Sequence, residues 1–200
     1  MTPTVTAEYA GTMWLLEPDD APAAIAPLLP AIFAPAGPDD TDRLTAAMGL
    51  PDSEEVRRRF ATGRRCYAAK CAGALAAYGW VSLDREAVGE LGLVIQLPPG
   101  DAYVWDCATA PAYRRHHLYT ALLAYIAGAL RADGRRRIWI GAAPDNTASH
   151  AGIMRAGFQP VADLFLARAT RQFTVRGRPG IPAEVVATAS QLFRDELPQE

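Results

Sequence analysis

The chain has 200 residues, of which 50% are hydrophobic and 21% charged, and its formal net charge is −2. This length and composition fit one compact domain with a buried core and exclude a disordered, collagen-like or coiled-coil chain. No apolar run approaches the roughly 20 residues that cross a bilayer, and the N-terminus lacks the pattern of a secretory signal. We therefore expect a cytoplasmic protein with no membrane partner. Cys66, Cys71 and Cys107 show no metal-ligand spacing, so we expect reduced thiols and no metal site.

Charge is distributed unevenly along the chain. Residues 1–42 contain seven acidic residues and no lysine or arginine. Residues 113–137 contain six arginines against one aspartate, and His116 and His117 follow the first arginine pair. A basic segment in an otherwise acidic chain favours a small polyphosphate ligand over a nucleic acid, which usually requires a basic domain. The alternative is a solvated arginine-rich face with no ligand.

The first half of the chain predicts short helices followed by strands. Trp14 belongs to a first strand, and five prolines divide the apolar segment 21–38 into one or two short helices. Capping residues and acidic side chains at 52–55 begin a helix that ends near Gly63. Residues 66–70 and 74–83 form a β-hairpin about a turn at 71–73, and residues 90–97 add another extended segment.

The second half alternates strands with amphipathic helices. A strand over 103–109 precedes a helix that begins near Leu118 and ends near Gly134, where apolar residues recur at helical spacing. A short strand over 138–140 leads to a helix capped by Asp145 or Asn146 and ended by Gly157. A strand over 158–166 and a terminal amphipathic helix over 182–197 complete the prediction.

Residues 102–126 combine a strand, a proline, a basic turn and an amphipathic helix. This order places Arg114 to Tyr119 at a helix N-terminus, where unpaired backbone N–H groups and the helix dipole attract anions. Two arginines and two histidines strengthen that site. The segment therefore predicts a pyrophosphate-binding turn.

Two segments together resemble the GNAT acyltransferases, which move an acyl group from coenzyme A to an amine. In the first, Pro111 and Tyr113 lead into Arg114-Arg115-His116-His117-Leu118-Tyr119, at the place of the family pattern Arg/Gln-x-x-Gly-x-Gly/Ala. In the second, Asn146, Ser149 and Gly157-Phe158 have the family's spacing. The resemblance covers roughly residues 65–168. It implies an α/β fold with a central, mostly antiparallel twisted sheet flanked by helices.

The resemblance also implies how the donor, acetyl-CoA or another acyl-CoA, is bound. Backbone groups of three consecutive strand residues would hold its pantetheine arm like an added strand and polarise the thioester carbonyl. The basic turn would hold its pyrophosphate, and the second segment would contribute two further residues. The implied contacts are Cys107, Ala108, Thr109, Arg114, Arg115, His116, His117, Leu118, Tyr119, Thr120, Asn146 and Ser149.

The chain departs from the family pattern at three positions. The family has glycine where this chain has His117, and glycine or alanine where it has Tyr119; a protonated imidazole can pair with phosphate instead. The position of a frequent family tyrosine, which resembles a general acid for the leaving thiolate, is Ile153 here. Either Tyr119 or Ser149 supplies the proton, or the thiolate leaves unaided.

The carboxylates near the central strand are candidates for the general base that deprotonates the acceptor ammonium. Strand alternation puts Asp106 on the face opposite to Trp105 and Cys107, and Asp101 on the same face as those two. Each aspartate has a structural alternative, a satisfied strand carboxylate or a turn residue, and Glu90 is a third candidate. A covalent role for Cys107 is disfavoured because no histidine follows at diagnostic spacing.

We therefore predict one acyltransferase domain over 1–168, with an acidic acceptor-side region at 1–63, a core at 64–168 and a C-terminal extension at 169–200. Its activity is N-acyl transfer, most simply of acetyl, to a small and cationic amine, in a possible homodimer. Two alternatives stay open. One is a donor with a longer acyl chain or an acyl carrier protein, and the other is a degenerate domain that binds a ligand or partner without turnover.

Overall fold

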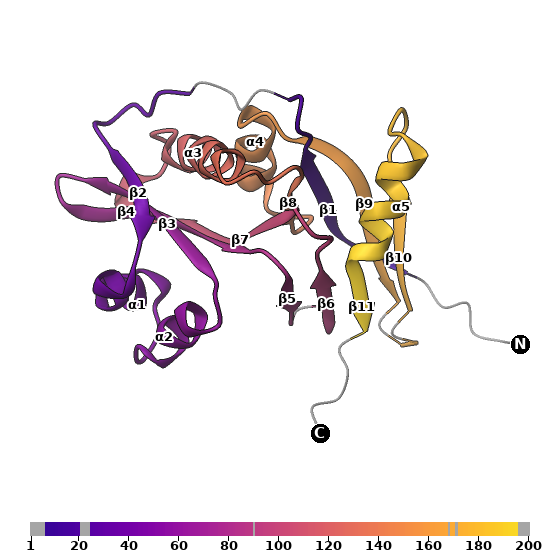
Figure 1. Cartoon of the computed structure of the whole chain (residues 1–200), viewed down its shortest axis with the longest axis horizontal. Coiled ribbons are helices and arrows are strands. Elements are labelled where there is room, and N and C mark those ends of the chain that lie inside the picture. Colours follow the sequence, from indigo (N-terminus) through magenta and orange to yellow (C-terminus); the bar gives the residue numbers. More distant parts are fainter. Residues whose placement is uncertain (1–6, 21–24, 90, 168, 171, 196–200) are drawn as a thin grey trace, which may run out of the picture.

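The computed structural model describes residues 7–20, 25–89, 91–167, 169–170 and 172–195, and Figure 1 shows a central sheet with helices on both faces. Eight strands of the described chain form this sheet, in the order β10-β9-β1-β8-β7-β4-β3-β2. All neighbours are antiparallel except β7 and β8, which are parallel. The strands are β1 Glu8–Leu16, β2 Ile32–Ala36, β3 Arg65–Cys71, β4 Ala74–Ser82, β7 Ala102–Thr109, β8 Ile138–Ala142, β9 Gln159–Ala167 and β10 Gln172–Gly177.

A smaller sheet of order β11-β6-β5 lies beside the large one. Its strands are β5 Arg85–Val88, β6 Leu93–Gln96 and β11 Phe193–Asp195. The helices are α1 Thr41–Met48, α2 Glu54–Ala61, α3 Leu118–Ala132, α4 Thr147–Arg155 and α5 Ala183–Leu192, and two single 3₁₀ turns cover Pro38–Asp40 and Pro111–Tyr113.

Three hydrophobic clusters fix where the helices lie. Helices α3 and α4 cover one face of the large sheet, with Leu122 and Ile126 fully buried against it. On the opposite face, α1 and α2 pack through Leu44 and Val56 against β3 and β4. At the other end of that face, α5 and the small sheet pack against β1, β8 and β9. The second face is therefore covered in two separate blocks, one on each side of β7.

Local sequence explains the elements that were predicted. The hairpin turn between β3 and β4 has Ala72 and Gly73 at positive φ, 48° and 83°, as a tight two-residue turn requires. Apolar residues at helical spacing bury one side of α3. The side chain of Asn146 caps α4 by accepting a hydrogen bond from the Ser149 backbone N–H at 3.1 Å.

The structure differs from the prediction in five places, and two of them are elements that were not predicted, α1 and β10. The expected short helices at 21–38 are wrong for the described residues 25–36: residues 25–31 are not helical, and 32–36 form edge strand β2 paired with β3. Pro35 is tolerated at an edge, where a missing N–H need not break a central ladder. The extended segment predicted at 90–97 is shorter in the structure, where it is strand β6. Strand β5, which pairs with β6, was not predicted. The terminal helix ends at Leu192 and continues as β11. Residues 21–24, Glu90 and 196–200 of these predictions lie outside the described residues.

The C-terminal segment packs on the same sheet as the rest of the chain. Strand β10 extends the large sheet beside β9, from Gln172 opposite Ala167 to Gly177 opposite Ala162. Helix α5 buries Val185, Ala189 and Leu192 in the cluster shared with β1 and β8. Strand β11 pairs with β6 and so completes the small sheet. The described part of the predicted extension thus helps to enclose the core.

Candidate active site

The site begins where two parallel strands separate. Strands β7 and β8 are paired from Ala102 opposite Ile138 to Val104 opposite Ile140, and the ladder ends there. Beyond that point β7 continues along β4 as far as Thr109, while β8 continues along β1 as far as Ala142. The two strands therefore diverge and leave a wedge between residues 105–109 and 141–143, which Figure 1 shows near the centre of the sheet.

A β-bulge in β7 lies at the mouth of this wedge. Asp106 has φ 40°, and the β4 ladder shifts register there, from Trp80 opposite Trp105 to Tyr78 opposite Ala108. The extra residue interrupts the alternation of side chains. Asp106 therefore lies on the side of Trp105, and Cys107 packs toward α3 in the other cluster. The predicted face of Asp106, opposite to Trp105, is wrong because strand parity cannot foresee a bulge.

Arg59 of α2 contacts the bulge on the face of the sheet that α2 covers. Its guanidinium carbon lies 4.4 Å from the ring centroid of Trp105 and 5.1 Å from that of Trp80. Its nitrogens form ion pairs with Glu55, at 2.7 Å, and with Asp106. The Tyr78 hydroxyl donates to the other carboxylate oxygen of Asp106 at 3.4 Å. Both oxygens of Asp106 are therefore engaged within the protein.

Asp101 occupies a different environment at the start of β7. It is buried, and the indole N–H of Trp139 donates to its Oδ2 atom at 2.9 Å. Burial raises the pKa of this carboxyl, against the opposing effect of the Trp139 hydrogen bond. Asp101 does not line the cavity described next. The two aspartates predicted as candidate bases are thus not brought together.

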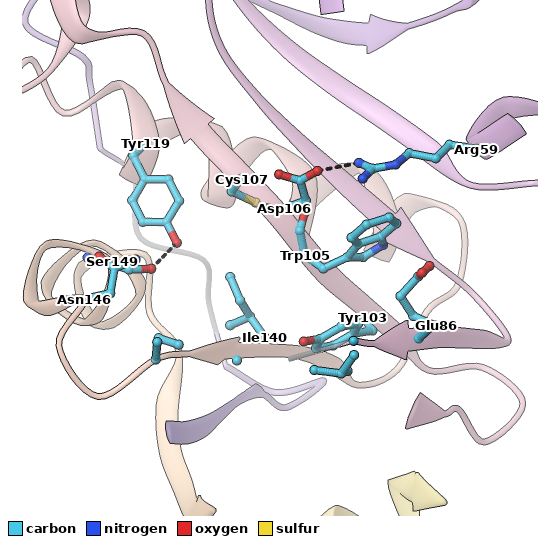
Figure 2. Close-up of a pocket in the computed structure, with 16 residues that line it drawn as sticks. Arg59, Glu86, Tyr103, Trp105, Asp106, Cys107, Tyr119, Ile140, Asn146 and Ser149 are labelled. Atoms are coloured by element: carbon cyan, nitrogen blue, oxygen red, sulfur yellow. Dashed lines mark hydrogen bonds and ion pairs between the residues drawn. The ribbon is translucent and has the colours of Figure 1, made fainter. Parts of the chain in front are cut away.

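A cavity of about 420 Å³ passes through the wedge from one face of the sheet to the other (Figure 2). On the α3–α4 side its walls come from the N-terminal ends of those helices, and on the opposite side they come from α2 and β5. Its lining residues are Arg59, Glu86, Ala87, Val88, Gly89, Tyr103, Trp105, Asp106, Cys107, Tyr119, Ile140, Gly141, Ala142, Ala143, Asn146 and Ser149. Among the described residues of the predicted acceptor-side region 1–63, Arg59 lines the cavity, and no acidic residue of segment 1–42 does.

Glu86 is the carboxylate that the sequence did not single out. It is buried in β5 and lines the cavity, and Figure 2 shows its side chain near Trp105. Its Oε2 atom accepts hydrogen bonds from the Ser82 hydroxyl and from Arg64 Nε, the latter at 3.0 Å. Within the described part of the chain its Oε1 atom has no such partner. No periodic pattern marked Glu86, because β5 is short and packs in a separate sheet.

Arg59 did carry a signal that the sequence reasoning missed. It is three residues from Val56 and adjacent to Phe60, so it shares the apolar face of α2 rather than the solvated one. A charged residue on an apolar helix face must find a buried partner. For the wall residues Tyr103 and Trp105, the sequence offered only their position on a strand next to the basic turn.

The basic turn stands at the N-terminus of α3 on the other side of the wedge. Arg115 and His117 both have positive φ, 63° and 60°, and His117 is the residue immediately before the helix. The N–H groups of Leu118, Tyr119 and Thr120 then have no carbonyl partner within the helix. Arg114 is exposed and ties the turn to β7 by donating from Nε to the Thr109 carbonyl at 3.3 Å. The ring of His116 contacts the Arg114 carbonyl at 2.7 Å.

Tyr119 and Ser149 join α3 to α4 at the cavity wall. Their hydroxyl oxygens lie 2.8 Å apart, and Figure 2 shows both beside the cavity. A Cβ at Gly152 would overlap the Tyr119 ring, so this glycine makes room for it. Burial raises the pKa of the Tyr119 phenol above its ordinary value, and the group therefore holds its proton across the working range of pH. Leu118 and Thr120 are buried and do not line the cavity.

Of the predicted site residues, the structure brings four together at the cavity, namely Cys107, Tyr119, Asn146 and Ser149. Residues 108 and 109 and the basic turn do not line it, although Arg114 ties the turn to Thr109. This arrangement offers backbone groups along a wedge and a positive helix end, which suit a pantetheine arm and a pyrophosphate. In the described residues no three histidine, cysteine or carboxylate side chains are placed to hold a metal ion. None of their helices is long and apolar enough to cross a membrane.

A family model for the acetyltransferase (GNAT) family matches residues 35–158. The chain belongs to the GNAT family. This confirms the resemblance inferred from the basic turn and the Asn146 to Phe158 segment. A comparison with curated proteins finds no match.

Solved structures confirm the GNAT fold. A GNAT acetyltransferase from Colwellia psychrerythraea has a TM-score of 0.61 at 14% identity, over 86% of this chain and 57% of that chain. A GCN5-related N-acetyltransferase from Kribbella flavida has a TM-score of 0.56 at 18% identity, over 88% and 60%. An aminoglycoside N-acetyltransferase in complex with CoA has a TM-score of 0.50 at 17% identity, over 64% and 91%. The chain therefore spans less than two thirds of the length of the first two neighbours.

Proposed function

We propose that this GNAT domain transfers an acyl group from an acyl-CoA to the amine of a small molecule. The observation that carries the proposal is the cavity that passes through the β7–β8 wedge. One end meets the N-terminal ends of α3 and α4, where an anionic donor would be held, and the other end meets the buried carboxylate of Glu86. A thioester and an amine can therefore approach each other from opposite faces of the sheet.

The donor side rests on backbone groups and positive charge. The unpaired edge of β7 at Cys107, Ala108 and Thr109 would pair with the amides of the pantetheine arm. The N–H groups of Leu118 to Thr120 and the side chains of Arg114, Arg115, His116 and His117 would bind the pyrophosphate. Asn146 caps the start of α4 through its side-chain oxygen, and it also lines the cavity.

We assign to Tyr119 the role of general acid, which protonates the leaving thiolate. Its phenol stays protonated because burial raises its pKa, and it lines the cavity next to Cys107. Ser149 fixes the orientation of the hydroxyl through the 2.8 Å contact. This hydroxyl takes the role that a tyrosine at the position of Ile153 would otherwise fill. Ile153 is fully buried in the core, which excludes it from any polar role.

We assign to Glu86 the role of general base, which deprotonates the acceptor ammonium. Asp106 already has both oxygens engaged by Arg59 and Tyr78, and Asp101 lies outside the cavity. Glu86 retains one oxygen that no described residue contacts. It would accept a proton from the acceptor ammonium, either directly or through one water.

The proposed reaction balances with these groups and solvent. Glu86 takes a proton from the ammonium, and the freed amine nitrogen forms a bond to the thioester carbonyl carbon. A backbone N–H at the bulge stabilises the negative charge that develops on the carbonyl oxygen. The attacking nitrogen, positively charged after it bonds to carbon, loses its second proton to solvent. The carbon–sulfur bond breaks, Tyr119 gives its proton to the thiolate, and solvent then reprotonates Tyr119 and takes the proton from Glu86. An uncharged amide and free CoA leave the site.

A cationic small amine fits the acceptor side, because Glu86 and Asp106 lie there and Arg59 is the single cation among the described lining residues. The cytoplasmic location and the homodimer stay predictions. A donor carried by an acyl carrier protein, or binding without turnover, would be indicated if CoA thioesters did not bind.

The test is release of free thiol from acetyl-CoA in the presence of a panel of primary amines. We expect turnover with cationic amines, and a loss of about 100-fold or more in kcat/KM for Glu86→Gln, the range of an absent general base. Asp84→Asn, an exposed carboxylate at the start of the same hairpin, is the matched control and should stay within twofold. Turnover that survives Glu86→Gln would refute the assignment of the base, and a preference for anionic amines would refute the acceptor class.

A further inference from the structure

A second, smaller cavity of about 120 Å³ lies on the α5 side of the large sheet. Its walls come from β1, β9, the small sheet and the end of β8. The lining residues are Ala10, Gly11, Met13, Val88, Leu91, Ile95, Tyr103, Gly141, Ala142, Ala143, Leu164 and Phe193. Among the described residues no charged side chain lines it, and apart from the Tyr103 hydroxyl the lining side chains are apolar.

This cavity shares a wall with the main one. Five residues line both, namely Val88, Tyr103, Gly141, Ala142 and Ala143. Three of these, Gly141 to Ala143, form the β8 side of the wedge. A group that leaves the wedge past Tyr103 and Gly141 therefore meets the apolar cavity directly. A Cβ at Gly141 would lie 3.3 Å from the Tyr103 hydroxyl oxygen, so this glycine keeps the passage open.

The charged groups of the site lie elsewhere. Arg59, Glu86 and Asp106 line only the main cavity, on its α2 and β5 side. An acceptor ammonium needs a carboxylate partner, and none of the described residues that line the second cavity supplies one. A saturated acyl chain needs only apolar walls, and its carbonyl carbon would sit at the wedge that both cavities share.

We propose that the second cavity binds the acyl chain of the donor, so that the enzyme prefers short-chain acyl-CoA thioesters longer than acetyl. This rests on the proposed acyl-CoA activity and specifies its donor. Met13, Ile95, Leu164 and Phe193 form the apolar end of the chain site. Phe193 links donor choice to the C-terminal segment, because it is the first residue of β11.

The experiment measures the Kd of free CoA and of acetyl-, butyryl- and hexanoyl-CoA by calorimetric titration of the whole chain. Burial of one methylene contributes about 0.8 kcal/mol, which is about fourfold in affinity. We therefore expect butyryl-CoA to bind on the order of tenfold tighter than acetyl-CoA. Ala10→Leu, at a half-buried position that lines only the second cavity, should abolish this gain while leaving the Kd of free CoA unchanged.

Two further variants sharpen the test. Ala74→Leu makes the same substitution at an exposed position of β4 and should retain the preference for butyryl-CoA. Leu91→Ala enlarges the cavity and should shift the preference toward hexanoyl-CoA.

Equal affinities for acetyl- and butyryl-CoA, or an unchanged preference in Ala10→Leu, would overturn the inference. If Ala10→Leu weakens only apolar amine acceptors, the cavity belongs to the acceptor and the inference is again wrong. Failure of free CoA and all thioesters to bind would instead refute the acyl-CoA activity itself.

Discussion

His117 adopts a backbone conformation that most side chains avoid. Its φ of 60° lies in the left-handed region, and it directly precedes α3. Glycine populates this region freely, whereas other residues meet a clash of Cβ with the backbone. The basic turn thus has a histidine with positive φ at the position where the family pattern has glycine, and the backbone is locally strained there. Histidine is one of the residues that tolerate this region best.

The strain at His117 predicts a difference between two substitutions. His117→Val should lower the free energy of unfolding by about 1–2 kcal/mol, because a β-branched residue is poorly tolerated at positive φ. His117→Gly should change it by less than about 0.5 kcal/mol, since relief of strain offsets the larger entropy of unfolded glycine. Denaturant unfolding measures both. His116→Val is the control, because His116 has no positive φ; an equal loss in both valine variants would contradict the account.

Tyr119 shows how far residue-level sequence reasoning reaches. The sequence identified it as a hydroxyl near the turn, and the structure places that hydroxyl 2.8 Å from the hydroxyl of Ser149, which the prediction named as the alternative proton donor. The space for its ring depends on Gly152, thirty-three residues away, which local patterns do not reveal. The catalytic role of Tyr119 stays a prediction.

Among the elements, helix and hairpin positions followed from local patterns, but pairing partners did not. The spacing of apolar residues predicted α3, and the capping residue Asn146 predicted α4. Strand β2 was missed because its stability comes from long-range pairing with β3 rather than from its own proline-rich sequence. The bulge at Asp106 was missed because it is set by register against β4.

Helix α2 offers a matched pair of arginines for a prediction at this scale. Arg58 and Arg59 both pair with Glu55, but only Arg59 also stacks on Trp105 and pairs with Asp106. Arg59→Ala should lower the free energy of unfolding by about 2–3 kcal/mol, because it leaves Asp106 without its ion-pair partner and removes the ring contacts. Arg58→Ala should cost less than about 0.5 kcal/mol, as exposed pairs do. Denaturant unfolding compares the two, and equal losses would refute the role given to Arg59.

At the scale of the whole molecule, the two halves of the site differ in how well the sequence predicts them. The donor side is nearly continuous in sequence, from Cys107 to Thr120, so its motif could be recognised directly. The acceptor side combines Arg59 of α2, Glu86 of β5 and Trp105 of β7, which only the fold brings together. Glu86 and the apolar cavity were therefore not predictable, whereas the family and the fold were. The donor role of residues 107–120 stays a prediction.

The central claim is that the β7–β8 wedge and the N-terminus of α3 bind CoA. The most direct measurement is calorimetric titration of the protein with acetyl-CoA, repeated on Arg114→Ala and on Arg57→Ala, an exposed arginine of α2. We predict micromolar binding that weakens about tenfold in Arg114→Ala, the loss expected for one charge-assisted hydrogen bond. Arg57→Ala should bind like the unchanged protein. Absence of binding, or equal binding in both variants, would contradict the claim.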